Sequence, residues 1–218
     1  MSAEFIAAIR AALLPLSDPV RAIGMAAYMK NQFPFLGVPT PVRRLAVKGL
    51  IRAFRGDALD AAALLWRQPE REFQYVACDL LRTKEATLSA ADLPALESLV
   101  VDKSWWDSVD SLAPCIGLLV LRERELVARM DALIRADNFW LRRVALLYQL
   151  GWKEQTDRVR LFGYCLACAP QSEFFIRKAI GWALRQYART EPKAVRDFLR
   201  LNGAVLSPLS VREAGKHL

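Results

Sequence analysis

The chain has 218 residues, of which 54% are hydrophobic and 25% are charged, so it has enough apolar material to bury a sizeable core. Thirty-one Lys and Arg against 23 Asp and Glu give a formal charge of +8, which favours an anionic partner such as nucleic acid. No apolar run approaches the roughly 18 residues of a membrane helix, so we expect no membrane partner and a cytoplasmic protein.

The N-terminal segment, residues 1–14, does not resemble a secretory signal. Glu4 precedes its apolar stretch, and a basic region and a small-residue cleavage site are missing. The chain's cysteines stand in apolar surroundings and are too few for a disulfide framework, which predicts reduced core residues. They are Cys78, Cys115, Cys165 and Cys168.

Helical periodicity dominates the rest of the chain and is broken at prolines, while strand-like alternation is hard to find, so the fold should be all-α. Four amphipathic segments begin with aromatic residues. Aligning Phe73, Trp106, Trp140 and Phe175 gives steps of 33, 34 and 35 residues by subtraction. This period predicts two helices per repeat and a helical solenoid of the HEAT or armadillo type, as one domain over residues 1–218 with a concave surface. A compact helical bundle would not require the recurrence.

The second aromatic segment, 104–111, carries two tryptophans and two carboxylates. Ser104 followed by Asp107 predicts a capping box at a helix start. Trp105 should begin a buried stripe that continues through residues 109, 112 and 116. Trp106 and Asp110 are one turn apart on a neighbouring stripe, and this aspartate has no obvious packing role.

Basic residues recur at the later repeat starts. The pairs Arg142-Arg143 and Arg177-Lys178 follow the aromatic residues, and Lys153 lies between them. A concave basic groove lined in this way would track a phosphate backbone.

Several stretches resemble the AlkD-type DNA glycosylases, alkylpurine repair enzymes built from HEAT-like repeats. The most specific are Lys-Ser-Trp-Trp-Asp-Ser-Val-Asp at 103–110 and Lys-Ala-Ile-Gly-Trp at 178–182, and further matches run from about residue 25 to the C-terminus. The resemblance implies a base excision repair enzyme that binds double-stranded DNA containing alkylated bases. It also implies that the damaged base is not held in a closed pocket.

The resemblance also assigns roles to residues. The family's catalytic aspartate falls on Asp110, its two sugar-facing tryptophans fall on Trp106 and Trp182, and its arginine falls on Arg143. A tyrosine that lines the family's DNA groove falls on Tyr28. We therefore expect catalysis by the first four of these. We expect DNA binding by Tyr28, Arg142, Lys153, Arg177 and Lys178.

The implied substrates are N3- and N7-alkylated purines such as 3-methyladenine and 7-methylguanine. Because these bases are cationic, they leave without protonation, and the enzyme needs only to stabilise the positive charge on the sugar and to position water. We expect a monofunctional hydrolase that acts as a monomer in the nucleoid, with no cofactor.

Other interpretations remain open. The tryptophans could be core residues, Arg143 an ordinary inter-repeat arginine, and Asp110 a partner of the helix dipole. The whole chain could be a non-catalytic HEAT-like scaffold for DNA or for an acidic protein. A metal site at Cys165 and Cys168 is not expected, since no second pair accompanies them and the only histidine is His217.

Overall fold

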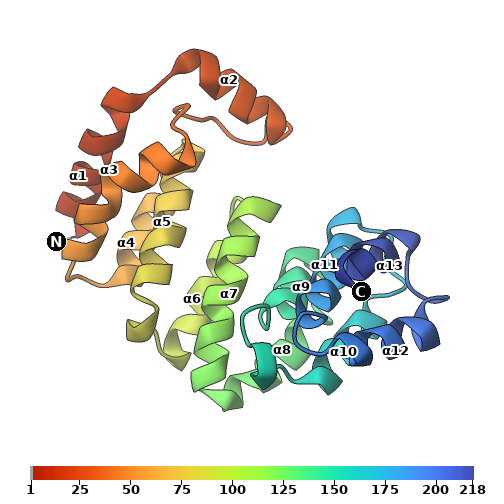
Figure 1. Cartoon of the computed structure of the whole chain (residues 1–218). Helices are drawn as coiled ribbons and strands as arrows, with labels where there is room; N and C mark the ends of the chain where they lie inside the picture. The colour runs from red at the N-terminus through yellow and green to blue at the C-terminus, as the bar shows by residue number, and fades with distance from the viewer. Residues whose placement is uncertain (1) are drawn as a thin grey trace. The chain divides into compact units, whose positions relative to one another are not determined.

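The structure, a computed structural model, describes residues 2–218 apart from the side chain of residue 217. Every regular element in this range is helical, which confirms the all-α prediction (Figure 1). The chain forms two units, Met1–Leu88 and Ser89–Leu218, each with its own buried core. The single continuous domain stays a prediction. Within the described range, no helix combines the length and apolar composition needed to cross a membrane.

The first unit packs four of its helices together and leaves one largely outside the core. The four are α1, α3, α4 and α5, whereas α2 has no buried residue. The helices are α1 (Ser2–Leu13), α2 (Pro19–Tyr28), α3 (Thr40–Ala53), α4 (Ala58–Trp66) and α5 (Arg71–Thr83), with short 3-10 turns at Leu14–Leu16 and Glu85–Thr87.

A buried carboxylate ties the loop before α3 to α5. Glu72 accepts hydrogen bonds from the backbone N–H groups of Leu36, Gly37 and Val38 at 2.9 to 3.0 Å, which satisfies three donors inside the core. Gly37 has a φ of +86°, and a Cβ there would lie 2.1 Å from the Asp18 carbonyl oxygen. Only glycine fits this turn without strain.

The second unit stacks α7, α9, α11 and α13 in sequence. Its helices are α6 (Leu93–Val101), α7 (Trp106–Arg122), α8 (Val127–Leu133), α9 (Phe139–Leu147), α10 (Arg158–Ala167), α11 (Phe174–Tyr187), α12 (Pro192–Asn202) and α13 (Pro208–Ala214). Short 3-10 turns lie at Ala90–Asp92, Arg124–Leu126, Lys153–Gln155 and Gly215–His217.

The aromatic period of the sequence corresponds to a repeated helix pair. Phe73 is the third residue of α5 and Trp106 is the first of α7. Trp140 and Phe175 are the second residues of α9 and α11. Side-chain hydrogen bonds in the second unit often join residues about one period apart, with separations of 32 or 33 residues. These bonds link each repeat to the next, as expected for a helical repeat protein. The HEAT type of the repeat remains a prediction.

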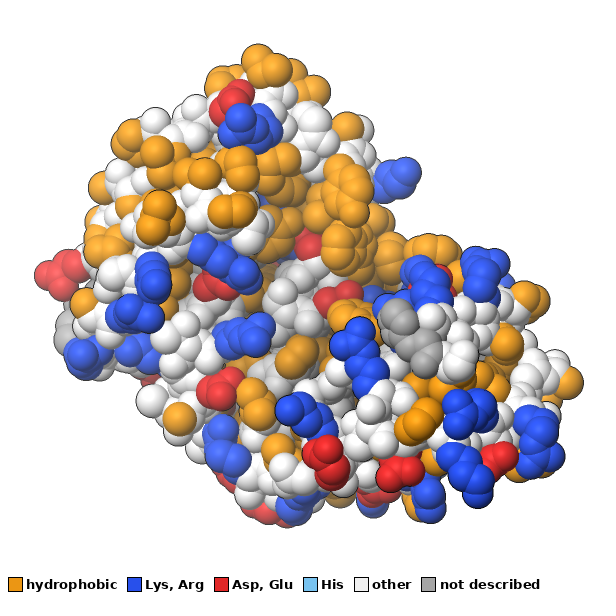
Figure 2. Space-filling model, viewed as in Figure 1, with side chains coloured by type: hydrophobic (Ala, Val, Ile, Leu, Met, Phe, Trp, Pro, Cys, Tyr) orange, Lys and Arg blue, Asp and Glu red, His pale blue; other side chains and the backbone are white. Residues whose placement is uncertain are grey.

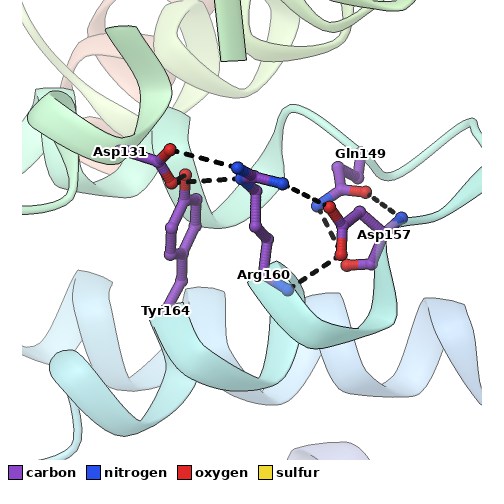
Figure 3. A network of polar contacts seen from close by, with 5 residues as sticks. All are labelled: Asp131, Gln149, Asp157, Arg160 and Tyr164. Atoms are coloured by element: carbon purple, nitrogen blue, oxygen red, sulfur yellow. Dashed lines mark hydrogen bonds and ion pairs between the residues drawn. The ribbon is translucent and has the colours of Figure 1, made fainter. Parts of the chain in front are cut away.

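One such link joins α8 to α10 through a polar network (Figure 3). Asp131 accepts a hydrogen bond from the Tyr164 hydroxyl at 2.6 Å and forms an ion pair with Arg160 at 3.2 Å. Arg160 also contacts Asp157 at 2.6 Å, and the Gln149 carboxamide accepts from the Asp157 backbone N–H at 2.7 Å. The network fixes the turn that leads into α10.

The start of α7 differs from the predicted capping box. The helix begins at Trp106, Trp105 is its N-cap without a side-chain bond, and the Ser104 hydroxyl donates instead to the Val100 carbonyl oxygen at 2.8 Å. Trp105 is only partly buried, although Val109 and the later residues of its predicted stripe are buried. The capping prediction was wrong because the Ser104 hydroxyl bonds to a carbonyl oxygen in the last turn of α6. All four cysteines are buried, as predicted.

Candidate active site

A cavity of about 260 Å³ in the second unit brings together all four residues predicted to be catalytic. α7 contributes two of its lining residues, α9 one, α11 five and α13 one. They are Trp106, Asp110, Arg143, Phe174, Phe175, Lys178, Trp182, Arg185 and Glu213. Trp106 and Trp182 are 76 positions apart in the sequence. They line the same cavity because α7, α9 and α11 stack on one another.

Asp110 is held from one side by a bidentate ion pair with Arg143. Nε donates to Oδ1 at 2.7 Å and Nη2 donates to Oδ2 at 2.8 Å. The third nitrogen, Nη1, donates to the Phe175 carbonyl oxygen. The Arg143 side chain is 5% exposed and that of Asp110 is 15% exposed. Arg143 is thus fixed by two neighbouring helices and sets the orientation of the carboxylate.

Burial and the guanidinium have opposite effects on this carboxyl group. Burial raises the pKa of Asp110 above its ordinary value of 3.8, and the hydrogen bonds and charge of Arg143 lower it without cancelling that effect. The group is therefore a partly desolvated carboxylate with one lone pair on each oxygen still available. Such a group interacts more strongly with a nearby positive charge than an exposed one does.

Aromatic side chains form the rest of the cavity wall. Trp106 precedes Asp110 by one helical turn, Trp182 lies across on α11, and both are partly exposed. Phe174, which is 54% exposed, also lines the cavity. Behind this wall, Trp105 packs against Phe175 with ring centroids 5.2 Å apart, which braces the starts of α7 and α11.

Sequence reasoning missed Glu213, a buried carboxylate in the same cavity. Its Oε1 lies 3.1 Å from Lys178 Nζ, and its Oε2 accepts from Arg185 Nη1 at 2.9 Å. A hydrogen bond from Lys216 lowers the pKa of Glu213 to about 2, against the opposing effect of burial and with further help from Lys178. Glu213 therefore holds two cationic side chains on the cavity wall.

A close approach of α13 to α11 places Glu213 there. A Cβ on Gly181 would lie 2.4 Å from the Glu213 Cβ and 2.9 Å from the Ser210 carbonyl oxygen. The Ser210 hydroxyl donates to the Arg177 carbonyl oxygen at 2.8 Å, which fixes the pairing. The matched Lys-Ala-Ile-Gly-Trp stretch contains Gly181, and the residues around Glu213 also resemble the family, but neither stretch predicted this contact.

The residues predicted to bind DNA lie in different surroundings. Arg142 Nη1 donates to the Ala136 carbonyl oxygen, and Arg177, its equivalent one repeat later, donates to the Gln171 carbonyl oxygen at 2.9 Å. Each arginine thus braces the loop six residues before it. Lys178 lines the cavity, and its side chain is 38% exposed although its ammonium forms an ion pair with Glu213.

The two remaining predicted DNA contacts are outside the cavity lining. Lys153 is exposed in the turn after α9. Tyr28 is the last residue of α2 in the first unit and is 70% exposed. Among the described residues, no group of three metal-ligating side chains occurs. DNA binding by all five of the predicted residues stays a prediction.

Comparison with known proteins identifies the family of a chain with this cavity. The family model for the DNA alkylation repair enzyme matches residues 9–218. This chain belongs to the DNA alkylation repair enzyme family. The repair enzyme is also similar to a solved structure described as a predicted DNA alkylation repair enzyme from Enterococcus faecalis, with 39% identity and a TM-score of 0.85. That match covers 93% of this chain and 96% of the other. No curated protein matches the chain. Family membership gives the protein a role in DNA repair.

Proposed function

We propose that this repair enzyme is a monofunctional DNA glycosylase that hydrolyses the N-glycosidic bond of N3- and N7-alkylated purines in duplex DNA. The observation that carries the proposal is the Asp110 carboxylate, oriented by Arg143 in the wall of a cavity that also presents Trp106 and Trp182. A fixed, partly desolvated carboxylate flanked by aromatic faces suits a site where positive charge develops during the reaction.

The chemistry needs no acid to protonate the leaving base. The alkylated purine already carries a positive charge, so the bond between C1′ and the base nitrogen breaks with its electron pair going to the base. The deoxyribose becomes oxocarbenium-like, and Asp110 stabilises it electrostatically. A water molecule then adds its oxygen to C1′ and releases a proton, which the Asp110 carboxylate accepts.

The other cavity residues assist this step in separate ways. Cation–π contact with the faces of Trp106 and Trp182 would favour the cationic sugar and base by roughly 0.5 to 2 kcal/mol each. Arg143 is a positioning residue, because all three of its nitrogens are committed to Asp110 and to the backbone. Lys178, held by Glu213 and partly exposed, is better placed to contact a phosphate next to the lesion.

Base release from methylated duplex DNA tests the proposal. Asp110→Asn keeps the side-chain volume and removes the charge, so release of 7-methylguanine should fall by about 100-fold to 1000-fold while DNA affinity persists. Asp131→Asn is the matched control, since it makes the same change in another Asp–Arg pair of the same unit. It should leave base release unchanged.

Two results would overturn the glycosylase proposal. The first is a wild-type protein that binds methylated duplex DNA but releases no alkylated base, in which case a non-catalytic scaffold role is the better account. The second is an Asp110→Asn variant that releases base at the wild-type rate, which would show that the carboxylate takes no part in the reaction.

A further inference from the structure

The Asp110 cavity contains a second carboxylate, Glu213, whose presence the proposed chemistry does not explain. Its side chain is 7% exposed although it is charged, and it reaches the cavity from α13. Burial of a carboxylate is costly unless cations surround it. Three cations do so here, because Lys178, Arg185 and Lys216 each have a nitrogen within 3.1 Å of a Glu213 oxygen.

Two of these cations stand on the same face of α11 as Trp182. Lys178 precedes Trp182 by four residues and Arg185 follows it by three, which are the spacings of neighbours on one side of a helix. All three side chains line the cavity. The indole proposed to favour the cationic sugar is therefore flanked by a cation one turn away on each side.

This arrangement creates an electrostatic conflict. Cations on the wall attract the anionic backbone of DNA, but they oppose the positive charge that develops on the deoxyribose as the base leaves. Lys and Arg side chains are also spread over the visible face of the second unit, with acidic side chains between them in places (Figure 2). A local carboxylate that offsets the cations of the wall reduces this conflict.

The charged residues of the cavity lining show the size of that offset. Without Glu213, the three cations Arg143, Lys178 and Arg185 would stand against Asp110 alone, a formal charge of +2. Glu213 lowers this formal charge to +1.

Glu213 also fixes where the two cations of α11 lie. Its Oε1 is 3.1 Å from Lys178 Nζ and its Oε2 accepts from Arg185 Nη1 at 2.9 Å, so both charged ends are held at α13. The Lys216 ammonium contacts both oxygens, at 2.8 and 2.9 Å. The close contact between α13 and α11 at Gly181 sets the position from which the carboxylate does this.

We propose that Glu213 is a positioning residue for base release, which holds Lys178 and Arg185 at α13 and offsets their charge beside the developing oxocarbenium ion. The inference rests on the glycosylase function proposed above and adds a second carboxylate to it. Asp110 acts on the sugar directly, whereas Glu213 acts through two cations.

The test compares two quantities, single-turnover release of 7-methylguanine with enzyme in saturating excess and affinity for undamaged duplex DNA. In Glu213→Gln, base release should fall by roughly 10-fold, because one more positive charge opposes the sugar cation. Affinity for the duplex should stay at the wild-type value or rise, since the cavity becomes more positive.

Glu97→Gln is the matched control. It makes the same change at another buried glutamate of the same unit, whose partner Arg129 lies outside the cavity lining. Both quantities should keep their wild-type values in this variant.

A second substitution separates charge from folding. Arg185→Gln added to Glu213→Gln returns the formal charge of the lining to +1, so base release should recover most of the lost rate. A purely structural Glu213 predicts no recovery, because the second substitution restores no contact between α11 and α13.

Four results would overturn the inference. They are base release at the wild-type rate in Glu213→Gln, an equal loss in Glu97→Gln, a parallel loss of DNA affinity in Glu213→Gln, and no recovery in the double variant. Failure of the glycosylase proposal is a separate result, because it appears as wild-type base release in Asp110→Asn. A wild-type protein without base release would contradict both.

Discussion

The second unit contains two Asp–Arg pairs that each join neighbouring repeats, and they differ in burial. Asp110 and Arg143 have side chains that are 15% and 5% exposed, whereas those of Asp131 and Arg160 are 41% and 39% exposed. The pKa of Asp110 is raised, because burial outweighs the contacts to Arg143. Burial also raises the pKa of Asp131, but hydrogen bonds from Tyr164 and Arg160 outweigh it, so this pKa is lowered.

The comparison teaches that one kind of ion pair can serve two purposes. A carboxylate that keeps its solvent and gains a hydroxyl donor is stabilised as a charge and strengthens a contact between repeats. A carboxylate that loses its solvent and keeps one guanidinium is held in place but remains energetically costly. Cost of that kind is common where a charge is used in chemistry.

Breaking each pair at its arginine should give the largest difference. Arg143→Met leaves a buried carboxylate without its counter-charge, and we expect it to lower the free energy of unfolding by about 3–5 kcal/mol. Arg160→Met removes an exposed partner and should cost about 1 kcal/mol or less. Urea denaturation of the two variants measures both values, and equal losses would contradict the assigned difference in burial.

The pH dependence of stability should have opposite signs at the two aspartates. A raised folded pKa means that wild type loses stability relative to Asp110→Asn as the pH rises from 3.8 through the folded pKa of Asp110. A lowered folded pKa means that wild type loses stability relative to Asp131→Asn as the pH falls from 3.8 through the folded pKa of Asp131. The change is at most about 1.4 kcal/mol per pH unit, and less at the exposed Asp131.

Unfolding free energies measured between acidic and neutral pH test these signs. The relevant quantity is the difference between wild type and each variant at the same pH. Two differences that change in the same direction with pH would show that burial does not separate the two carboxyl groups.

Removing the hydroxyl donor should also give a small effect. Tyr164→Phe deletes the 2.6 Å hydrogen bond to Asp131, so we expect a loss of roughly 0.5–1.5 kcal/mol and a higher pKa for that aspartate. An NMR titration of the Asp131 carboxyl carbon measures the pKa directly. Tyr187→Phe, which removes a hydroxyl from a buried tyrosine on α11, is the control and should leave the titration unchanged. An unchanged pKa of Asp131 in Tyr164→Phe would show that the Tyr164 hydroxyl does not lower it.

The candidate site was predictable where sequence spacing carried the information. Trp106 and Asp110 share a helix, so their separation of four residues placed them on one side. The repeat period and the resemblance to a known family predicted that Trp182 and Arg143 would lie in the same site. Glu213 lies in a stretch that resembles the family but received no role, because its place in the cavity depends on how closely α13 approaches α11 at Gly181.

The cap of α7 shows the opposite limit. A serine three residues before an aspartate has the pattern of a capping box, yet the Ser104 hydroxyl donates to Val100 in the preceding helix. A local pattern shows which hydrogen bonds a side chain can form. The conformation of the chain before the helix determines which of them forms.

By itself the sequence determined the helical class, the recurrence of about 34 residues and the identity of the aromatic and charged residues that begin each repeat, because these depend on periodicity along the chain. Only the tertiary structure decided which carboxylate is buried and in which direction each pKa moves. Desolvation depends on side chains from helices far apart in the sequence, and their packing is not written in any local pattern.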